Sequence, residues 1–538
     1  MRKLSTFSAI VIALIVSCHH ETEKLNRLVQ NGEFSKAIKD EAPDSPASSG
    51  QGLMQKLVEM LGTGDQAAYE RFAQQNYAPA ALAEYPAEDH AASLARIYTD
   101  TGGFNDVRVV GEATDWVQAE ACARITGIPS CLTLNRSKVD GRDFITDFSV
   151  RDLYPAGPEL EAPTRDEVVR TIDTLAQKYA NHDLFSGVIL IAKGDEVIYK
   201  KAYGKASIAY DVPMTVDTRL NTASIGKSFT GVAIAQLVEA GKLSFDDTVG
   251  KVWPDYPNKE VRDKVTIRQL LTHTSGLGPK DYYDDPRYQA LSSNIHSVAD
   301  YMKLAVDTPL GAQPGEYLYS NSGYIIVGTI VERLSGQSFY DYVQEHIFKP
   351  AGMTRSLYAP ADVKKLGTAS SLTNFHEKSD HSYIYRLGPP LETSLQGGSI
   401  GGPQGGAWVT ADDLFSFEKA LRGGKLVSPA MLEKMTTAQG PSGAGASGLS
   451  GEARPGLGVE VITRNGHTFL GHTGGDFGVA SFVYWYPDTG YTTIALSNRD
   501  PRAARVLLNV FRGLLTRKTL GNATPPPQTC TPPASNGR

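Results

Sequence analysis

A serine and a lysine stand three residues apart, at Ser224 and Lys227, just before the apolar run 232–238. A serine hydroxyl is a weak nucleophile at its free pKa, and a neighbouring amine can help to remove its proton. If this segment is helical, both side chains lie on one face, one turn apart. A buried helix would also lower the pKa of the lysine, as a base requires. The pair therefore indicates an activated serine nucleophile.

The same Ser-x-x-Lys spacing occurs again at Ser416 and Lys419. This copy lies inside an amphipathic helix pattern that begins with the capping-box variant 410–413. Its serine would lie in mid-helix, where no helix N-terminus faces a developing oxyanion. We therefore expect 416–419 to be surface, and the spacing alone does not identify a catalytic serine.

Two further segments supply groups suited to the same chemistry. Tyr319 and Asn321 offer a phenol and an amide just before the apolar helix pattern 325–331. A hairpin signal at 465–466 leads into a strand pattern that contains the sequence His-Thr-Gly-Gly at 472–475. That strand would present hydrogen-bond donors and bare backbone along its edge.

These three segments stand in the order and approximate spacing of the motifs of penicillin-recognising serine enzymes, which this chain resembles. Because its second motif begins with tyrosine, it is similar to the class C β-lactamase and D-alanyl-D-alanine carboxypeptidase branch. The resemblance covers residues 166 to 515 approximately and includes the stretch 266–277, which is common in that family. It implies an α+β fold, with an antiparallel sheet flanked by helices and a helical region inserted between its strands.

The resemblance also implies acyl transfer to Ser224, followed by hydrolysis of the acyl-enzyme. Lys227 and Tyr319 would share the acid and base roles, and which of them first takes the serine proton stays open. An ammonium favours a nearby phenolate, so the pair should titrate as a coupled unit. Asn321 would orient either the substrate or Lys227.

The strand motif would form the substrate side of the site. Thr473 would bind substrate, and the backbone N–H groups of Ser224 and Gly475 would form an oxyanion hole. His472 departs from most β-lactamases, which have a permanently charged lysine there. Histidine, with a pKa of ~6.5, is only partly charged at neutral pH. We therefore expect affinity for carboxylate-bearing substrates to fall as the pH rises; the alternative is a structural, hydrogen-bonded His472.

Carboxypeptidases and esterase-like members of the family also carry histidine at this position. The resemblance thus implies a D-Ala-terminated peptide, another D-amino-acid peptide or an ester as substrate, with penicillin acylating slowly at most. A sensor that acylates and barely turns over is the alternative. A third hypothesis places the main function in the N-terminal domain, as a small-molecule or partner-binding module. The natural substrate and the oligomeric state stay open.

Composition limits the other functions. The 538 residues are enough for two or three domains, and 41% hydrophobic residues can fill real cores. A net charge of −6 gives no electrostatic case for nucleic acid. None of the 11 histidines forms a zinc motif, so we expect no metal and no cofactor.

The first residues are typical of an export signal. A positive start at Arg2 and Lys3 precedes a short apolar run, so we expect a signal peptide over 1–17. The segment 15–18 is similar to a bacterial lipobox, which would make Cys18 the lipidated first residue of a protein anchored to the membrane surface in the periplasm. An ordinary secretory signal is the alternative.

The remaining chain divides by pattern. Residues 18–51 are expected to be a linker or tether. Helix patterns and then strand patterns over 52–158 predict a small α+β accessory domain that weakly resembles nuclear transport factor 2. The serine hydrolase domain is expected over 164–515, with a sheet built from its first two and last three strands. A Pro-rich tail at 516–538 is expected to be disordered.

Two further expectations concern a pair of cysteines and a glycine-rich segment. Cys122 and Cys131 flank a turn signal on strands that should pair, so they either form a hairpin disulfide or remain two buried thiols. The glycine-rich segment 397–406 is expected to be too flexible to be a core element.

Overall fold

The computed structural model describes residues 50–152, 162–278, 282, 287–291, 294–380, 382–394, 396–441, 453–464, 466–500 and 502–517. These residues form two compact units. Among these residues the smaller unit comprises those in 50–152 and 374–389, and the larger comprises those in 162–373 and 390–517. The predicted signal peptide, Cys18, the linker up to residue 49 and the tail from residue 518 lie outside the described residues.

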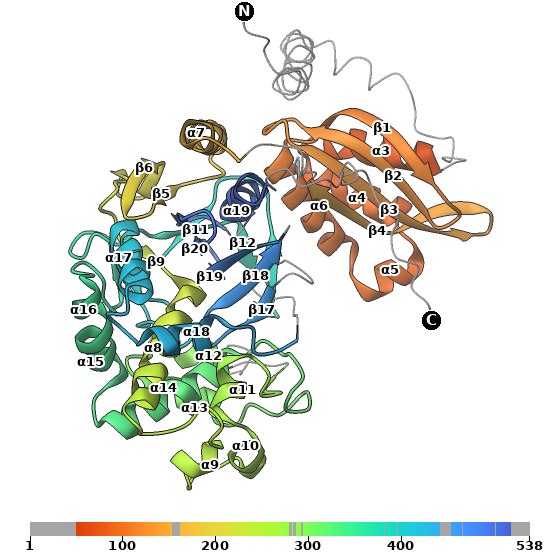
Figure 1. The fold of residues 1–538 in the computed structure, drawn as a ribbon. Helices are drawn as coiled ribbons and strands as arrows, with labels where there is room; N and C mark the ends of the chain where they lie inside the picture. Colours follow the sequence, from red (N-terminus) through yellow and green to blue (C-terminus); the bar gives the residue numbers. More distant parts are fainter. Residues whose placement is uncertain are drawn as a thin grey trace, which may run out of the picture. The chain divides into compact units, whose positions relative to one another are not determined.

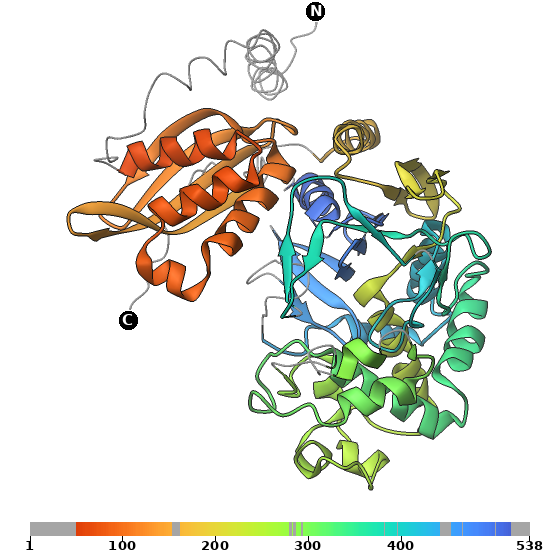
Figure 2. The same ribbon diagram turned by 180° about the vertical axis from the view of Figure 1, so that it is seen from behind.

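Four helices and one antiparallel sheet build the N-terminal part of the smaller unit (Figure 1). The helices are α3 (Gly50–Leu61), α4 (Gln66–Asn76), α5 (Pro79–Glu84) and α6 (Ala87–Thr101). The strands, paired in sequence order, are β1 (Phe104–Glu112), β2 (Trp116–Ala123), β3 (Pro129–Val139) and β4 (Arg142–Asp152). Helices lie across one face of the sheet, as Figure 2 shows, and apolar side chains such as Leu57 and Leu132 fill the layer between them. The predicted α+β order is present, and the likeness to nuclear transport factor 2 stays a prediction.

A hairpin from far along the sequence completes the core of this unit. Strands β12 (Phe375–Glu377) and β13 (Tyr383–Tyr385) pair with each other, and Ile384 and Tyr385 are buried in the same apolar cluster as α3 and α6. The Gln66 side chain bonds the backbone on both sides, donating to the Tyr385 carbonyl at 3.0 Å and accepting from Leu387 N at 2.9 Å. The boundaries drawn from sequence did not include this segment, because its apolar pattern does not say which unit it joins.

Neither predicted state of the two cysteines is present: Cys122 is buried and not part of a disulfide, whereas Cys131 is disulfide-bonded, so the two do not form the hairpin disulfide. Strand register gives the reason: Cys122 pairs with Pro129, whereas Cys131 pairs with Glu120. The two cysteines are therefore offset along the ladder and not directly opposite each other.

The larger unit is organised around a seven-stranded antiparallel sheet in the order β17-β18-β19-β20-β21-β5-β6. The strands are β5 (Gly187–Lys193), β6 (Glu196–Tyr203), β17 (Ala453–Pro455), β18 (Glu460–Arg464), β19 (His467–Asp476), β20 (Val479–Tyr486) and β21 (Tyr491–Ser497). The predicted first two and last three strands are all present. Two short strands, β17 and β18, extend the sheet beyond the prediction.

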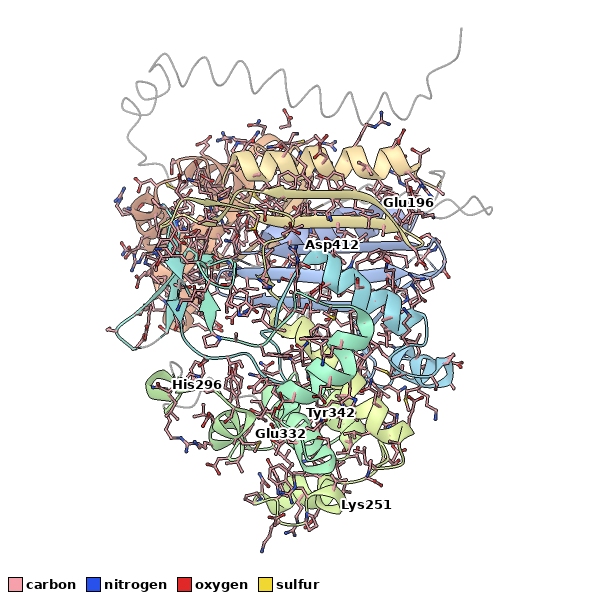
Figure 3. The ribbon with its side chains drawn as sticks, turned by 90° about the vertical axis from the view of Figure 1, so that its left-hand side faces the viewer. Glu196, Lys251, His296, Glu332, Tyr342 and Asp412 are labelled. Carbon is pink, nitrogen blue, oxygen red and sulfur yellow. The ribbon has the colours of Figure 1, made fainter. Side chains whose placement is uncertain are left out.

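Helices cover both faces of this sheet. Figure 3 shows α7 (Arg165–Asn181) along one face and the helical region, which carries Glu332 and Tyr342, on the other. The last helix, α19 (Arg502–Leu515), packs against α7, β20 and β21. On the opposite face α8 (Gly226–Glu239) is buried around nearly its whole circumference, as expected of a helix in the centre of a large core.

The remaining elements of the larger unit are further helices and short strand pairs. The helices are α9 (Val249–Val252), α10 (Lys259–Lys264), α11 (Ile267–Leu271), α12 (Arg287–Leu291), α13 (Val298–Ala305), α14 (Asn321–Ser335), α15 (Phe339–Val343), α16 (Lys349–Ala351), α17 (Ala411–Arg422), α18 (Pro429–Thr436), the 3₁₀ turn η1 (Ala223–Ile225) and the π turn η4 (Gln344–Phe348). The strand pairs are β7 (Lys205–Ser207) with β8 (Val212–Pro213), β9 (Leu220–Asn221) with β16 (Trp408–Val409), β10 (Ala361–Asp362) with β15 (Gln396–Gly397), and β11 (Ser371–Thr373) with β14 (Leu391–Thr393).

Order extends slightly past two predicted boundaries. Helix α3 begins at Gly50, two residues inside the expected linker. At the other end Thr516 is fully buried and Arg517 donates to Glu167 on α7 at 2.6 Å, so these residues do not belong to a disordered tail. No helix within the described residues combines the length and apolarity needed to cross a membrane.

Candidate active site

Ser224 lies in the 3₁₀ turn η1, directly before α8, at the N-terminal end of a buried helix. The residue before it, Ala223, has a positive φ of 42°, which is unusual for a residue with a side chain. Two hydrogen bonds hold it there: Ala223 N donates to Asn221 Oδ1 at 2.8 Å, and Gly406 N donates to the Ala223 carbonyl at 3.1 Å. The surrounding chain therefore fixes the direction of the serine side chain.

Lys227, in the first turn of α8, is fully buried directly behind Ser224. Its Nζ lies within hydrogen-bonding distance of three acceptors: Ser224 Oγ at 2.9 Å, Asn321 Oδ1 at 2.6 Å and the Gln404 carbonyl at 2.7 Å. An ammonium has three N–H donors and no acceptor, so this set satisfies it completely. If Lys227 loses one proton, the amide and carbonyl oxygens still hold its two N–H groups. Its lone pair then faces Ser224 Oγ.

Tyr319 donates its phenol proton to Ser224 Oγ at 2.8 Å. Removal from water raises the pKa of Tyr319 well above its usual value and outweighs the lowering effect of the hydrogen bond to Ser224. The phenol is therefore protonated at neutral pH. Burial therefore opposes the phenolate that a nearby ammonium would favour, and the coupled titration of the pair stays a prediction.

The His273 ring packs against the Tyr319 ring. The two rings stack with centroids 4.1 Å apart, and His273 Nδ1 accepts a hydrogen bond from Ser320 N at 3.1 Å. Burial, reinforced by the nearby Lys227 charge, holds the pKa of His273 well below 6.5, so the ring is neutral. The stretch 266–277 had signalled a family likeness, but nothing in its sequence assigned this contact.

Asn321 begins α14, whose N-cap is Ser320. Ser320 Oγ accepts from Gly323 N at 3.1 Å, which fixes the start of the helix and so the position of the neighbouring amide. Between the two roles predicted for Asn321, the geometry matches the orientation of Lys227.

The glycine-rich segment 397–406 is not a flexible loop at its C-terminal end, and that prediction was wrong. Residues 402–405 are buried against the start of α8. A side chain at Gly405 would place Cβ 2.2 Å from the Ala223 carbonyl oxygen, and Thr230 Oγ1 donates to the Pro403 carbonyl at 2.6 Å. Glycine is needed here for close backbone approach rather than for mobility.

Strand β19 lies beside Ser224. Strand β18 pairs with it only as far as Gly471, opposite Glu460, so among the described residues no strand pairs with 472–476 on that side. This open edge lies against η1 so closely that a Cβ on Gly474 would be 2.2 Å from the Thr222 carbonyl oxygen and 3.1 Å from Ser224 N. An edge beside a nucleophile can pair with an extended substrate, and N–H groups at 224 and 475 can hold an oxyanion there.

His472 points from β19 into the core, and only 3% of its surface is exposed. Its Nδ1 lies 2.5 Å from the Thr473 carbonyl oxygen, so Nδ1 carries the proton and Nε2 is left as an acceptor. Burial lowers the pKa of His472, with a further lowering from the Lys227 charge, despite the opposing effect of Glu460. The predicted partial positive charge at neutral pH is therefore wrong: His472 is neutral, because a cation there would be buried near another cation.

A small pocket lies beside Tyr319. Its lining includes His273, Tyr317, Arg454, Glu460 and His472. The sequence did not single out Glu460, because an isolated glutamate at the start of a strand carries no motif.

The second Ser-x-x-Lys copy lies in the middle of α17, and its prediction as surface is only partly correct. Ser416 and Lys419 are half-buried, whereas Phe417 and Glu418 between them are buried. Among the described residues, no group of three or more His, Cys, Asp or Glu side chains is arranged to hold a metal ion.

Residues 171–516 match the family described as Beta-lactamase, which is more than half of the chain. This chain belongs to the β-lactamase family. It is a β-lactamase-related serine hydrolase with an antiparallel sheet and flanking helices, as its sequence predicted.

Similar proteins carry names from the same family. The chain is 28% identical to penicillin-binding protein 4* of Bacillus subtilis over 349 residues, which are 62% of this chain and 72% of that protein. It is 33% identical over 190 residues to a putative D-alanyl-D-alanine carboxypeptidase of Escherichia coli K12, covering 32% of this chain and only 43% of that protein. A penicillin-binding protein structure from Bacillus halodurans has a TM-score of 0.52 and 28% identity, covering 65% of this chain and 99% of the other.

Proposed function

We propose that this chain is an exported serine hydrolase that forms an acyl-enzyme at Ser224 and acts on a D-Ala-type peptide, an ester or a related amide. The single observation that carries the proposal is the convergence of two donors on one hydroxyl. Ser224 Oγ accepts from Lys227 Nζ at 2.9 Å and from Tyr319 OH at 2.8 Å. The name of the Escherichia coli relative supports D-alanyl substrates.

The raised pKa of Tyr319 supports a division of roles between the two groups. Lys227, in its neutral form, takes the Ser224 proton as the nucleophile attacks the substrate carbonyl. The backbone N–H groups of Ser224 and Gly475 stabilise the oxyanion, each worth about 3 kcal/mol in the transition state. Tyr319, already a phenol, gives its proton to the leaving group, and Lys227 returns the serine proton to Tyr319, so both groups regain their starting forms. Water then attacks the acyl carbon and gives one proton to Lys227, which passes it to Ser224 Oγ as the acyl bond breaks and the acid is released.

The test combines a variant with direct detection of the intermediate. Ser224→Ala should abolish turnover of a short-chain aryl ester and of an acetylated D-Ala-D-Ala peptide while leaving the unfolding transition unchanged. Intact-protein mass spectrometry should find an acyl adduct on the wild type and none on the variant. An active Ser224→Ala protein would refute the proposal.

A penicillin-binding sensor or a slow β-lactamase is the second candidate, favoured by the penicillin-binding names of the relatives. A sensor would accumulate a long-lived adduct with a chromogenic cephalosporin and would hydrolyse neither the ester nor the peptide. Comparing the lifetimes of the three adducts distinguishes a sensor from a hydrolase.

We also propose that the protein is exported and anchored by a lipid on Cys18. The positive start, the apolar run and the lipobox-like segment 15–18 support this. Mass spectrometry of the mature N-terminus should find a lipidated Cys18, and accumulation of the unprocessed form under globomycin should accompany it. An unmodified N-terminus elsewhere would exclude the anchor.

A further inference from the structure

Asp476 is the last residue of β19 and lies on the face of that strand that is directed toward the nucleophile. Side chains alternate along a strand, so Asp476 shares a face with Gly474, where a Cβ would lie 3.1 Å from Ser224 N. The partner strand confirms this face: Ser481 pairs with Gly474 and donates its hydroxyl proton to the Asn221 carbonyl at 3.0 Å. The Asp476 side chain therefore lies on the same side of the sheet as the turn that carries Ser224.

The turn that follows Asp476 is held in place by hydrogen bonds and close packing. Asp476 Oδ1 accepts from Phe477 N at 2.8 Å, and Gly478 N donates to Asp500 Oδ1 at 2.8 Å. Gly478 has a positive φ of 68°, and a Cβ there would lie 2.6 Å from Leu372 N. The carboxylate therefore has a defined position at the end of the open edge of β19.

This carboxylate has no positive partner in the described part of the chain. Desolvation by the surrounding protein raises the pKa of Asp476, the hydrogen bond from Phe477 lowers it, and the charge of Asp500 raises it again, whereas no cation of the described residues lowers it. The side chain is nevertheless exposed. A group that is both desolvated and exposed lies in a recess of the surface, where a ligand can reach it.

Two tyrosines lie close enough to Asp476 to interact with its charge. Burial raises the pKa values of Tyr282 and Tyr301, and the charge of Asp476 contributes to both rises. The two rings pack edge to face with centroids 5.4 Å apart, and Tyr301 donates to the Ile400 carbonyl at 2.7 Å. Both phenols are neutral at pH 7, so they leave the charge of Asp476 uncompensated.

Asp476 and Tyr319 lie toward opposite ends of the substrate strand. Tyr319 and His472 line one pocket, whereas Asp476 is farther along β19 by about 13 Å at roughly 3.3 Å per residue. Since Tyr319 is the proposed proton donor to the leaving group, the leaving group lies at the His472 end and the acyl group at the Asp476 end. The α-nitrogen of an aminoacyl group is only about 2.5 Å from its carbonyl carbon. A carbonyl oxygen bound by Gly475 N therefore brings that nitrogen next to Asp476.

We propose that Asp476 binds the free α-ammonium of the residue that acylates Ser224. An ammonium supplies the positive charge that the carboxylate lacks and offers it three N–H donors. The preferred substrates are therefore peptides, amides or esters of an amino acid whose amino group is unblocked, ahead of their N-acylated counterparts. This inference rests on the proposed acyl-enzyme chemistry at Ser224 and narrows its substrate class.

The test compares two substrates of similar shape: D-alanine p-nitroanilide, and isobutyric acid p-nitroanilide, in which a methyl group replaces the ammonium. The assay is run at about pH 6.5, where an α-ammonium with a pKa of about 7.7–8.0 is charged. Asp476→Asn should lower kcat/KM for the ammonium substrate by about tenfold, mainly through KM, because an opposite charge no longer assists binding. The neutral substrate should change by less than about twofold. An unchanged ratio between the two substrates in Asp476→Asn would overturn the inference.

Two control variants separate the charge from the fold of the turn. Asp476→Asn keeps an oxygen for the hydrogen bond from Phe477 N, and Asp476→Glu keeps the charge, so Asp476→Glu should retain part of the preference for the ammonium substrate. Asp488→Asn removes an exposed carboxylate from the turn at the other end of β20 and should leave the ratio unchanged. An Asp488→Asn protein that loses the preference as fully as Asp476→Asn would argue against a specific role of Asp476.

Salt provides a readout that a merely structural role would not move. Raising the salt concentration from about 0.05 M to about 0.5 M should lower kcat/KM for the ammonium substrate in the wild type but not in Asp476→Asn. The neutral substrate should be insensitive to salt in both proteins. Equal salt effects in the two proteins would assign the loss to packing and count against the ion pair.

Competition decides the question if neither anilide is hydrolysed. D-alanine amide should inhibit hydrolysis of an aryl ester at an about tenfold lower concentration than isobutyramide does, and Asp476→Asn should abolish that difference. Hydrolysis of the aryl ester that depends on Ser224 is measured first in every protein. A wild type without that activity would refute the proposed function, whereas an active wild type that does not distinguish the two amides would refute only the role of Asp476.

Discussion

Gly474 sets the distance between the substrate strand and the nucleophile, and Gly474→Ala should therefore impair catalysis. The added Cβ would lie 2.2 Å from the Thr222 carbonyl oxygen, whereas an ordinary contact needs about 3.4 Å. Since both partners are backbone, β19 must move away from η1 by roughly 1 Å. A displacement of that size at an oxyanion hole costs about 10²-fold in rate or more.

The assay is the rate of Ser224 acylation by an aryl ester under single-turnover conditions, with urea unfolding measured alongside. We expect acylation to fall by about 10²- to 10³-fold, and the free energy of unfolding to fall by about 1–3 kcal/mol because of overpacking. Gly241→Ala is the control: Gly241 has a positive φ of 69° with open space around it, so alanine there should cost stability without slowing acylation. A stably folded Gly474→Ala enzyme that acylates at the wild-type rate would refute the reasoning.

Four further predictions concern other parts of the molecule. Lys227→Met should slow acylation by about 10²- to 10⁴-fold, because it removes the proposed base; wild-type single-turnover rates would contradict that role. His273 and His472 are held neutral by lowered pKa values, so protons bind the unfolded chain more readily; urea unfolding should show stability falling below about pH 6.5 by at most about 1.4 kcal/mol per pH unit for each. The KM for a carboxylate substrate should accordingly stay flat between about pH 6.5 and 8. A rise in KM over that range would show instead that His472 carries a positive charge that it loses as the pH rises. Tyr385→Ala should lower the stability of the smaller unit by about 3 kcal/mol in urea unfolding, whereas Tyr383→Ala, 43% exposed on the same strand, should have little effect; equal effects would argue against the hairpin as part of that core.

The chemistry-bearing residues were visible in the sequence because each stands in a local pattern. Ser224 and Lys227 share one helical turn, so their proximity follows from helix geometry alone. Asn321 lies at the start of a helix that the apolar run 325–331 predicts. The strands were also indicated by local alternation and turn signals, which is why the first two and last three were identified, although their order in the sheet was not.

Contacts between distant segments could not be predicted in the same way. The Gln404 carbonyl binds Lys227 across 177 residues, and a backbone carbonyl has no sequence signature. The hairpin Asn374–Pro389 joins the smaller unit through Ile384 and Tyr385, although its own pattern fits either unit. Both depend on which surfaces meet after the chain has folded.

The sequence by itself determined which functional groups this protein has and which of them are neighbours along one element. Only the tertiary structure decided their charge. His472 would be partly cationic in water, but burial beside Lys227 keeps it neutral, and burial keeps Tyr319 a phenol. Protonation depends on desolvation and on charges brought from elsewhere in the chain, and neither exists until the core has closed.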